Sequence, residues 1–78
     1  MAQTETLARA LLYTHPDCEY STILKDELIA DGTQFDEIDL TVHPERWDEV
    51  VQLSGGDRIT PVMVARDGSV EIGYHGVG

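Results

Sequence analysis

The chain contains one cysteine, Cys18, whose position suits a thiol nucleophile. It lies between a short apolar run at residues 11–13, followed by Pro16, and a segment whose apolar residues recur at helical spacing. A residue at the start of a helix lies beside free backbone N–H groups and the positive end of the helix dipole. Both stabilise a thiolate, so we expect a lowered pKa for Cys18 and a reactive sulfur. The alternative is a buried, inert cysteine, which is common among unpaired thiols.

Charged neighbours act on this sulfur in opposite directions. Asp17 and Glu19 flank it with negative charge, which favours the neutral thiol. His15 and Lys25 are the nearby candidates for a positive charge. We expect no metal site, because the chain has one cysteine and its three histidines lack ligand-like spacing. The other two histidines are expected in a helix-entry loop (His43) and in solvent (His75).

A second chemical feature is Pro61, at the mouth of a predicted strand. Proline cannot donate to a sheet ladder, so it is confined to strand starts and edges. If the Thr60–Pro61 bond is cis, the backbone N–H and C=O of Thr60 are free to pair with an extended, peptide-like ligand. The alternative is an ordinary trans proline that begins a strand, as most X–Pro bonds are trans.

Six predicted elements position these residues. The second of the two helices has Trp47, Val50, Val51 and Ser54 on its inner face, which places Trp47 in the core. The order strand, helix, strand, helix, strand, strand predicts an α/β fold with a mixed four-stranded sheet, in one domain spanning residues 1–78. In chain order the elements are a strand at 11–13, a helix at 20–28 closed by residues 31–32, a strand at 34–40, a helix opening at 43–45, and strands at 60–65 and 70–72, joined by a turn at 66–69.

Composition restricts the partners and the compartment. The 78 residues carry a formal charge of −10, from 15 acids against 5 Lys and Arg, which argues against nucleic-acid binding. The acids either form a solvated surface or select partners that have a basic patch. A single cysteine cannot form an internal disulfide, which fits a reducing compartment. Residues 1–6 are unlike a signal peptide, and no apolar stretch approaches the roughly 20 residues of a membrane helix. We therefore expect a cytoplasmic protein without membrane contact.

Three segments, in the same order and at similar spacing, resemble the glutaredoxin family of the thioredoxin-fold superfamily. They are residues 13–21, residues 58–62 and a final segment with Asp67-Gly68 and Gly73, and Cys18-Glu19-Tyr20-Ser21 matches the family's C-x-x-C or C-x-x-S motif. The resemblance covers nearly the whole chain and implies a thioredoxin/glutaredoxin-like fold. Within the family, segments 13–16, 25–28 and 43–46 are similar to the UXX-star branch, in which the nucleophilic position often carries selenocysteine.

This resemblance implies a thiol-disulfide oxidoreductase in which Cys18 is catalytic and glutathione is the co-substrate. Ser21 cannot resolve a disulfide, so exchange would be monothiol, and its hydroxyl is left as a donor to the thiolate. The partners would be glutathione or protein disulfides, and the protein a monomer. The resemblance also implies a cis Pro61, contacts from the Thr60 backbone to the cysteinyl part of glutathione, Tyr20 beside the sulfur, Arg58 on a ligand carboxylate, and substrate contacts from His15, Gly73 and Tyr74.

Two departures from the family pattern bear on glutathione recognition. His15 stands where a lysine is usual, and it holds carboxylates less firmly. The usual Gly-Gly-x-Asp near the end is replaced by residues 73–76, so the acid that meets the ligand's ammonium group is missing. Two alternatives therefore remain on the same fold. One is an iron–sulfur cluster carrier, for which Glu19 departs from the usual C-G-F-S motif, and the other is a non-catalytic interaction domain.

Overall fold

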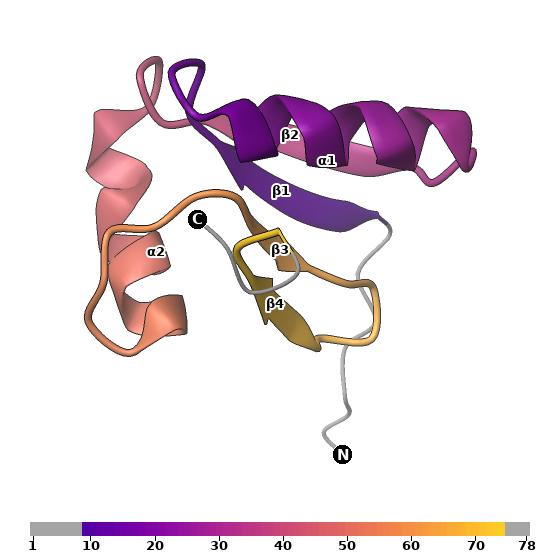
Figure 1. Cartoon of the computed structure of the whole chain (residues 1–78). Coiled ribbons are helices and arrows are strands. Elements are labelled where there is room, and N and C mark those ends of the chain that lie inside the picture. The colour runs from indigo at the N-terminus through magenta and orange to yellow at the C-terminus, as the bar shows by residue number, and fades with distance from the viewer. Residues whose placement is uncertain (1–8, 75–78) are drawn as a thin grey trace.

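The computed structural model describes residues 9–74, which form a four-stranded mixed sheet with two α-helices (Figure 1). This element order confirms the predicted α/β fold, while the assignment of residues 1–78 to one domain stays a prediction. No helix of the described segment is long and apolar enough to cross a membrane. The elements are β1 (Ala10–Thr14), α1 (Glu19–Ala30), β2 (Phe35–Asp39), the 3-10 turn η1 (Pro44–Arg46), α2 (Trp47–Ser54), β3 (Val62–Val64) and β4 (Val70–Ile72).

The sheet has the strand order β2-β1-β3-β4, so β1 is a central strand. β1 runs parallel to β2, with Tyr13 opposite Ile38, as expected for two strands joined by a crossover helix. β1 runs antiparallel to β3, with Tyr13 opposite Val62, and β3 pairs antiparallel with β4. The carboxyl end of β1 therefore lies beside the start of β3.

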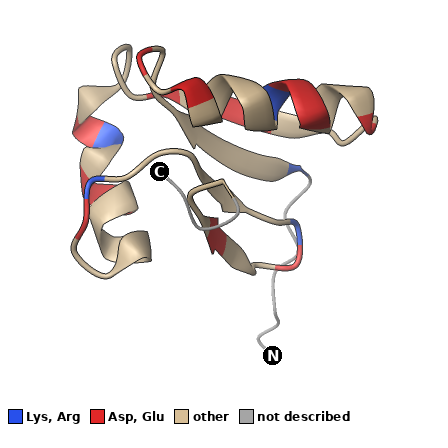
Figure 2. Cartoon of the chain, viewed as in Figure 1, with Lys and Arg blue, Asp and Glu red and all other residues tan. Residues whose placement is uncertain are grey.

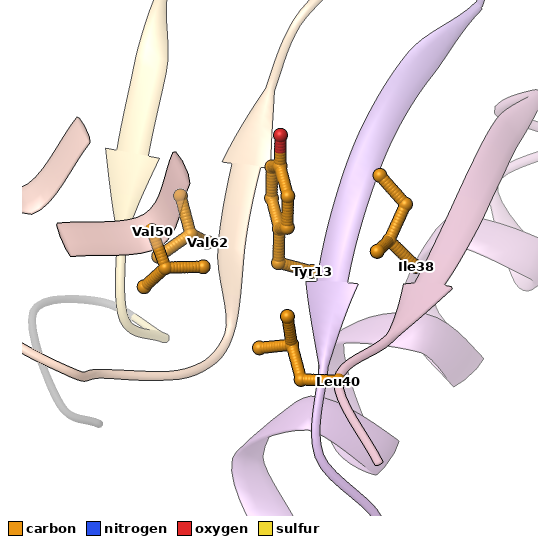
Figure 3. Close-up of a cluster of buried hydrophobic side chains, with 5 residues drawn as sticks. All are labelled: Tyr13, Ile38, Leu40, Val50 and Val62. Atoms are coloured by element: carbon orange, nitrogen blue, oxygen red, sulfur yellow. The ribbon is translucent and has the colours of Figure 1, made fainter. Parts of the chain in front are cut away.

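One face of the sheet packs against α2. Its buried cluster combines Tyr13 of β1, Ile38 of β2, Leu40, Val50 of α2 and Val62 of β3 (Figure 3). Residues directly opposite each other in neighbouring strands share a face of the sheet. Tyr13 lies opposite both Ile38 and Val62, which explains why these three side chains belong to one cluster. The burial of these side chains fixes α2 against the centre of the sheet.

The opposite face packs against α1. Because side chains alternate along a strand, Leu12 points away from the Tyr13 cluster. Leu12 is fully buried, and Leu28 of α1 is also buried. Glu37, which pairs with Leu12 across the strands, contacts Lys25 of α1. The two helices thus cover opposite faces of the sheet.

Glycine residues end both helices. Gly32 has φ +76°, and the next N–H, from Thr33, donates to the Leu28 carbonyl at 2.9 Å. Gly55 has φ +80°, and the Gly56 N–H donates to the Val51 carbonyl at 2.8 Å. Both arrangements use a left-handed glycine to satisfy the last carbonyls of a helix.

The structure differs from the sequence prediction at three places. The segment that opens the second helix is a 3-10 turn, and regular α-helix begins only at Trp47. His43 precedes that turn, as expected, whereas His75 lies outside the described residues. The third strand is shorter than predicted and begins at Val62, because Pro61 has no N–H to donate to the sheet. Trp47 is half-buried at the edge of the core cluster rather than inside it, since it begins α2.

We predict that Leu12→Ala lowers the free energy of unfolding by about 2–5 kcal/mol, because it empties a fully buried position in a small core. The matched control is Ile29→Ala on α1, where the side chain is 62% exposed, and its effect should stay within about 0.5 kcal/mol. Urea unfolding followed by far-ultraviolet circular dichroism measures both. Equal losses in the two variants would show that the α1 face is not the core described here.

Candidate functional site

Cys18 is the residue that caps the start of α1, as the sequence predicted. Its backbone is extended, with φ −99° and ψ 110°. The Cys18 N–H donates to the His15 carbonyl at 2.9 Å, which closes a tight turn after β1. The Ser21 N–H donates to the Cys18 carbonyl at 3.1 Å, so the helix begins at this residue. The side chain is partly exposed, which leaves the sulfur open to a reaction partner.

The segment before β3 meets this sulfur. The Cys18 thiol donates to the backbone carbonyl of Thr60, with a sulfur–oxygen distance of 3.3 Å. The Thr60–Pro61 peptide bond is cis, which confirms the expectation, and both residues are buried. The Pro61 carbonyl accepts a hydrogen bond from the Gly73 N–H at 2.7 Å. Residues from the start of α1, the mouth of β3 and the end of β4 therefore meet at one place.

The pKa of Cys18 is lowered from its ordinary value. Burial, the largest influence, raises the pKa of the thiol. Hydrogen bonds from the side chains of Thr60 and Ser21, and from the backbone N–H groups of Ser21 and Tyr20, together outweigh it. The contact between the thiol and the Thr60 carbonyl favours the protonated form. The thiolate therefore depends on the Thr60 side chain and on the hydroxyl and N–H donors at the start of α1, and the predicted direction of the pKa shift is confirmed.

The charged neighbours are not among the main causes of this pKa shift. Acidic side chains are spread along α1, with Lys25 among them (Figure 2). The Asp17 side chain is 93% exposed, so water and salt screen its charge. Lys25 pairs with Glu37 at 3.3 Å, and His15 accepts the Asp17 N–H at its Nδ1. Hydrogen bonds from Thr60 and from the start of α1, rather than nearby charges, thus lower the pKa of Cys18.

Ser21 joins the loop to the helix. Its side chain is buried, with 2% exposure, and its Oγ accepts the backbone N–H of His15 at 3.3 Å. The same hydroxyl lowers the pKa of Cys18. Ser21 therefore both holds the loop between β1 and α1 in place and stabilises the thiolate.

Two groups of rings lie near the site. The guanidinium carbon of Arg58 is 5.1 Å from the centre of the Trp47 ring, and the His15 ring is 6.2 Å from the same ring. The Tyr20 and Tyr74 rings stack, with centroids 6.2 Å apart and an angle of 18° between the planes. The Tyr74 hydroxyl donates to the Glu27 carboxylate of α1.

Trp47 is the residue that sequence reasoning placed elsewhere. Helical periodicity assigned it to the core, yet it contacts two predicted site residues, Arg58 and His15. Its contact with Arg58 joins the start of α2 to the loop between α2 and β3, and no local pattern in the sequence predicts this contact. The structure thus brings the predicted residues together in three groups, while their roles in substrate binding stay predictions. The groups are Cys18 with Ser21, Thr60, Pro61 and Gly73; His15 with Arg58 through Trp47; and Tyr20 with Tyr74.

The described part of the chain offers no ready metal centre. Residues 9–74 contain no group of three His, Cys, Asp or Glu side chains that could hold a metal ion. Cys18 is the one thiol in the sequence, so an iron–sulfur cluster here would need ligands from outside this chain.

Comparison with known proteins agrees with this arrangement. The glutaredoxin family model matches residues 10–70. The gene 56 protein of Mycobacterium phage L5 is 34% identical over 74 residues, which are 94% of this chain and 71% of that protein. The crystal structure of the glutaredoxin from Archaeoglobus fulgidus superposes with a TM-score of 0.73 at 24% identity, over 86% of this chain and 76% of that chain. At that identity the structural match shows the shared fold alone.

We predict that Ser21→Ala moves the midpoint of Cys18 alkylation to higher pH, because a donor to the thiolate is removed while burial still raises the pKa. Less thiolate would then be present at neutral pH, and alkylation there would slow. The measurement is the rate of iodoacetamide reaction against pH, with Cys18→Ser as the blank. Thr22→Ala, an exposed hydroxyl on the same turn of helix, is the control and should leave the midpoint unchanged. An unchanged midpoint in Ser21→Ala would contradict this account of the thiolate.

Proposed function

The chain belongs to the glutaredoxin family, and we propose that it is a monothiol thiol-disulfide oxidoreductase that exchanges glutathionyl groups through Cys18. The observation that carries this proposal is the position of Cys18, at the start of α1 with a lowered pKa and in contact with the Thr60 backbone. A lowered pKa increases the fraction of thiolate, the form that attacks disulfides. The partly exposed side chain lets a disulfide reach the sulfur.

In the first step the Cys18 thiolate attacks the glutathione sulfur of a mixed disulfide between glutathione and a substrate. A new sulfur–sulfur bond forms between Cys18 and glutathione, and the original bond breaks. The electron pair of that bond leaves with the substrate sulfur, which takes a proton from solvent and becomes a thiol. The substrate is reduced, and the protein carries the glutathionyl group.

In the second step the thiolate of another glutathione attacks the glutathionyl sulfur on Cys18. Glutathione disulfide forms, and Cys18 leaves as a thiolate. Since the chain has no second cysteine, release requires this external thiol. The sum of the two steps converts one glutathionylated substrate and one glutathione into the free substrate thiol and glutathione disulfide.

The backbone of Thr60 supports binding of an extended ligand beside the sulfur. The Thr60 N–H makes no hydrogen bond within residues 9–74. An N–H at the mouth of a strand is a suitable donor to the backbone of a peptide-like ligand, as in the addition of a strand to a sheet edge. In this proposal the cysteinyl part of glutathione pairs there, with Tyr20 and Tyr74 nearby and Gly73 bonded to Pro61.

The setting of this activity is also a proposal. We infer a monomer acting in the cytoplasm, with glutathione as co-substrate and protein disulfides as further partners. The relation to the UXX-star branch stays a prediction. Sequencing the natural gene tests this relation, and a selenocysteine codon at position 18 would support it.

We predict that the protein catalyses glutathione-dependent reduction of a glutathionylated peptide, and that Cys18→Ser reduces the rate to that of the uncatalysed reaction. Intact-mass spectrometry should detect one glutathionyl group on the wild-type protein after reaction with glutathione disulfide, and glutathione should remove it. Thr22→Ala is the control variant and should keep the wild-type rate. A wild-type protein that forms the adduct but does not turn over would favour a non-catalytic interaction domain instead.

A further inference from the structure

Most cations of this acidic chain are already paired with carboxylates. Arg9 lies 3.6 Å from Asp36, and Lys25 lies 3.3 Å from Glu37. Arg46 bonds to Glu49, with its Nη2 at 2.8 Å from a carboxylate oxygen. Arg58 is different, because no carboxylate partner for it is found among residues 9–74. An exposed guanidinium without a carboxylate, in a chain of charge −10, is suited to bind an anion from outside.

The Trp47 ring holds this guanidinium in place. Arg58 lies over the ring at 5.1 Å from its centroid, a distance at which a cation is attracted to an aromatic face. Within residues 9–74 the Arg58 side chain makes no hydrogen bond, so its N–H groups are left to bind a ligand. Trp47 is itself fixed, because it packs against the core cluster at the start of α2. The contact therefore orients Arg58 without consuming its hydrogen-bond donors.

The same ring connects Arg58 to the reactive sulfur. Trp47 lies 6.2 Å from the ring of His15, and the His15 carbonyl accepts the Cys18 N–H. Arg58 itself lies two residues before Thr60, and the Thr60 carbonyl accepts a hydrogen bond from the Cys18 thiol. Trp47 thus joins the loop that carries the nucleophile to the loop that carries the cation.

From these contacts we propose that Trp47 is a positioning residue, which holds Arg58 ready to bind a carboxylate of the group attached to Cys18. This inference rests on the proposed function: the family resemblance implies a ligand carboxylate for Arg58, and the new element is the residue that holds the guanidinium in place. By holding Arg58, Trp47 offsets the repulsion of the protein's net charge for disulfides that carry a carboxylate near the reacting sulfur. Neutral and cationic disulfides gain nothing from the Arg58–Trp47 pair.

The first test uses fluorescence and needs no turnover. Trp47 is the one tryptophan in the sequence, so its emission reports on this ring. Mixed disulfides of Cys18 are prepared with glutathione disulfide, which leaves an anionic adduct, and with hydroxyethyl disulfide, which leaves a neutral one. The glutathione adduct should change the emission relative to the neutral adduct, and Arg58→Gln should abolish the difference. Identical emission of the two wild-type adducts, or a difference that persists in Arg58→Gln, would overturn the proposal.

The second test separates positioning from a merely structural role. For a glutathionylated peptide, Arg58→Gln should raise KM about tenfold, the scale of one lost charge-assisted hydrogen bond, while kcat stays within about twofold. Trp47→Leu should show the same split, and Trp47→Phe should recover part of the KM, since it keeps an aromatic face for Arg58. Arg9→Gln removes the same charge at the opposite end of β1 and should leave KM unchanged.

Circular dichroism of each variant identifies any loss of fold, and Trp47→Phe and Arg58→Gln keep the proposal testable if Trp47→Leu does not fold. An unchanged KM in Arg58→Gln, or a fall in kcat alone, would refute the role of the pair. The experiments distinguish failure of the proposed function from failure of the role proposed for Trp47. If the wild-type protein forms both adducts but has no turnover, the proposed function is wrong, and the fluorescence of the adducts still decides the role of Trp47.

Discussion

β1 and β3 run antiparallel, so the end of one lies beside the start of the other at a single edge of the sheet. Tyr13 opposite Val62 sets this register, and both side chains are buried in the α2-facing cluster. A slip of one residue would turn that row of side chains to the opposite face, which makes the register costly to change. Because the register is fixed, the Cys18 loop meets Thr60 and Pro61 across 42 positions of sequence. The core therefore determines the geometry of the reactive sulfur.

Within that geometry, short-range hydrogen bonds dominate over net charge. The chain has a formal charge of −10, and Asp17 and Glu19 flank the sulfur, yet the pKa of Cys18 is lowered. Charges on exposed side chains are weakened at short range by the high dielectric constant of water, and salt screens them further beyond a Debye length of about 10 Å at 0.1 M ionic strength. Hydrogen bonds from donors in contact with the sulfur act at a few ångströms and escape that screening. An acidic surface and a stabilised thiolate are therefore compatible.

The sequence predicted what depends on local pattern. The order of elements, the place of Cys18 at the start of α1 and the glycine that ends this helix each follow from neighbouring residues. The cis bond before Pro61 followed only from the family resemblance, since the residues alone favour a trans bond. The contact between Trp47 and Arg58 could not be predicted, because it depends on how the loop between α2 and β3 folds back. Helical periodicity identifies an inner face, but it does not show which end of that face borders a site.

The donors that stabilise the thiolate also couple the fold to the exchange chemistry. In the structure the Cys18 side chain makes no capping hydrogen bond to α1, although the N–H groups of Tyr20 and Ser21 are placed to stabilise its thiolate. A lowered pKa in the folded state means that the thiolate adds stability above the unfolded pKa, and that this stability is lost as pH falls through the folded pKa. A glutathionyl adduct carries no charge on this sulfur at any pH, so α1 loses that contribution when the adduct forms. The helix start thus favours release of Cys18 as a thiolate, because a leaving group of lower pKa departs faster. The nucleophilicity of a thiolate falls as its pKa falls. Burial raises the pKa of Cys18 and so opposes the hydrogen-bond donors. Burial therefore preserves the reactivity of the sulfur as the attacking group in the first step of the exchange.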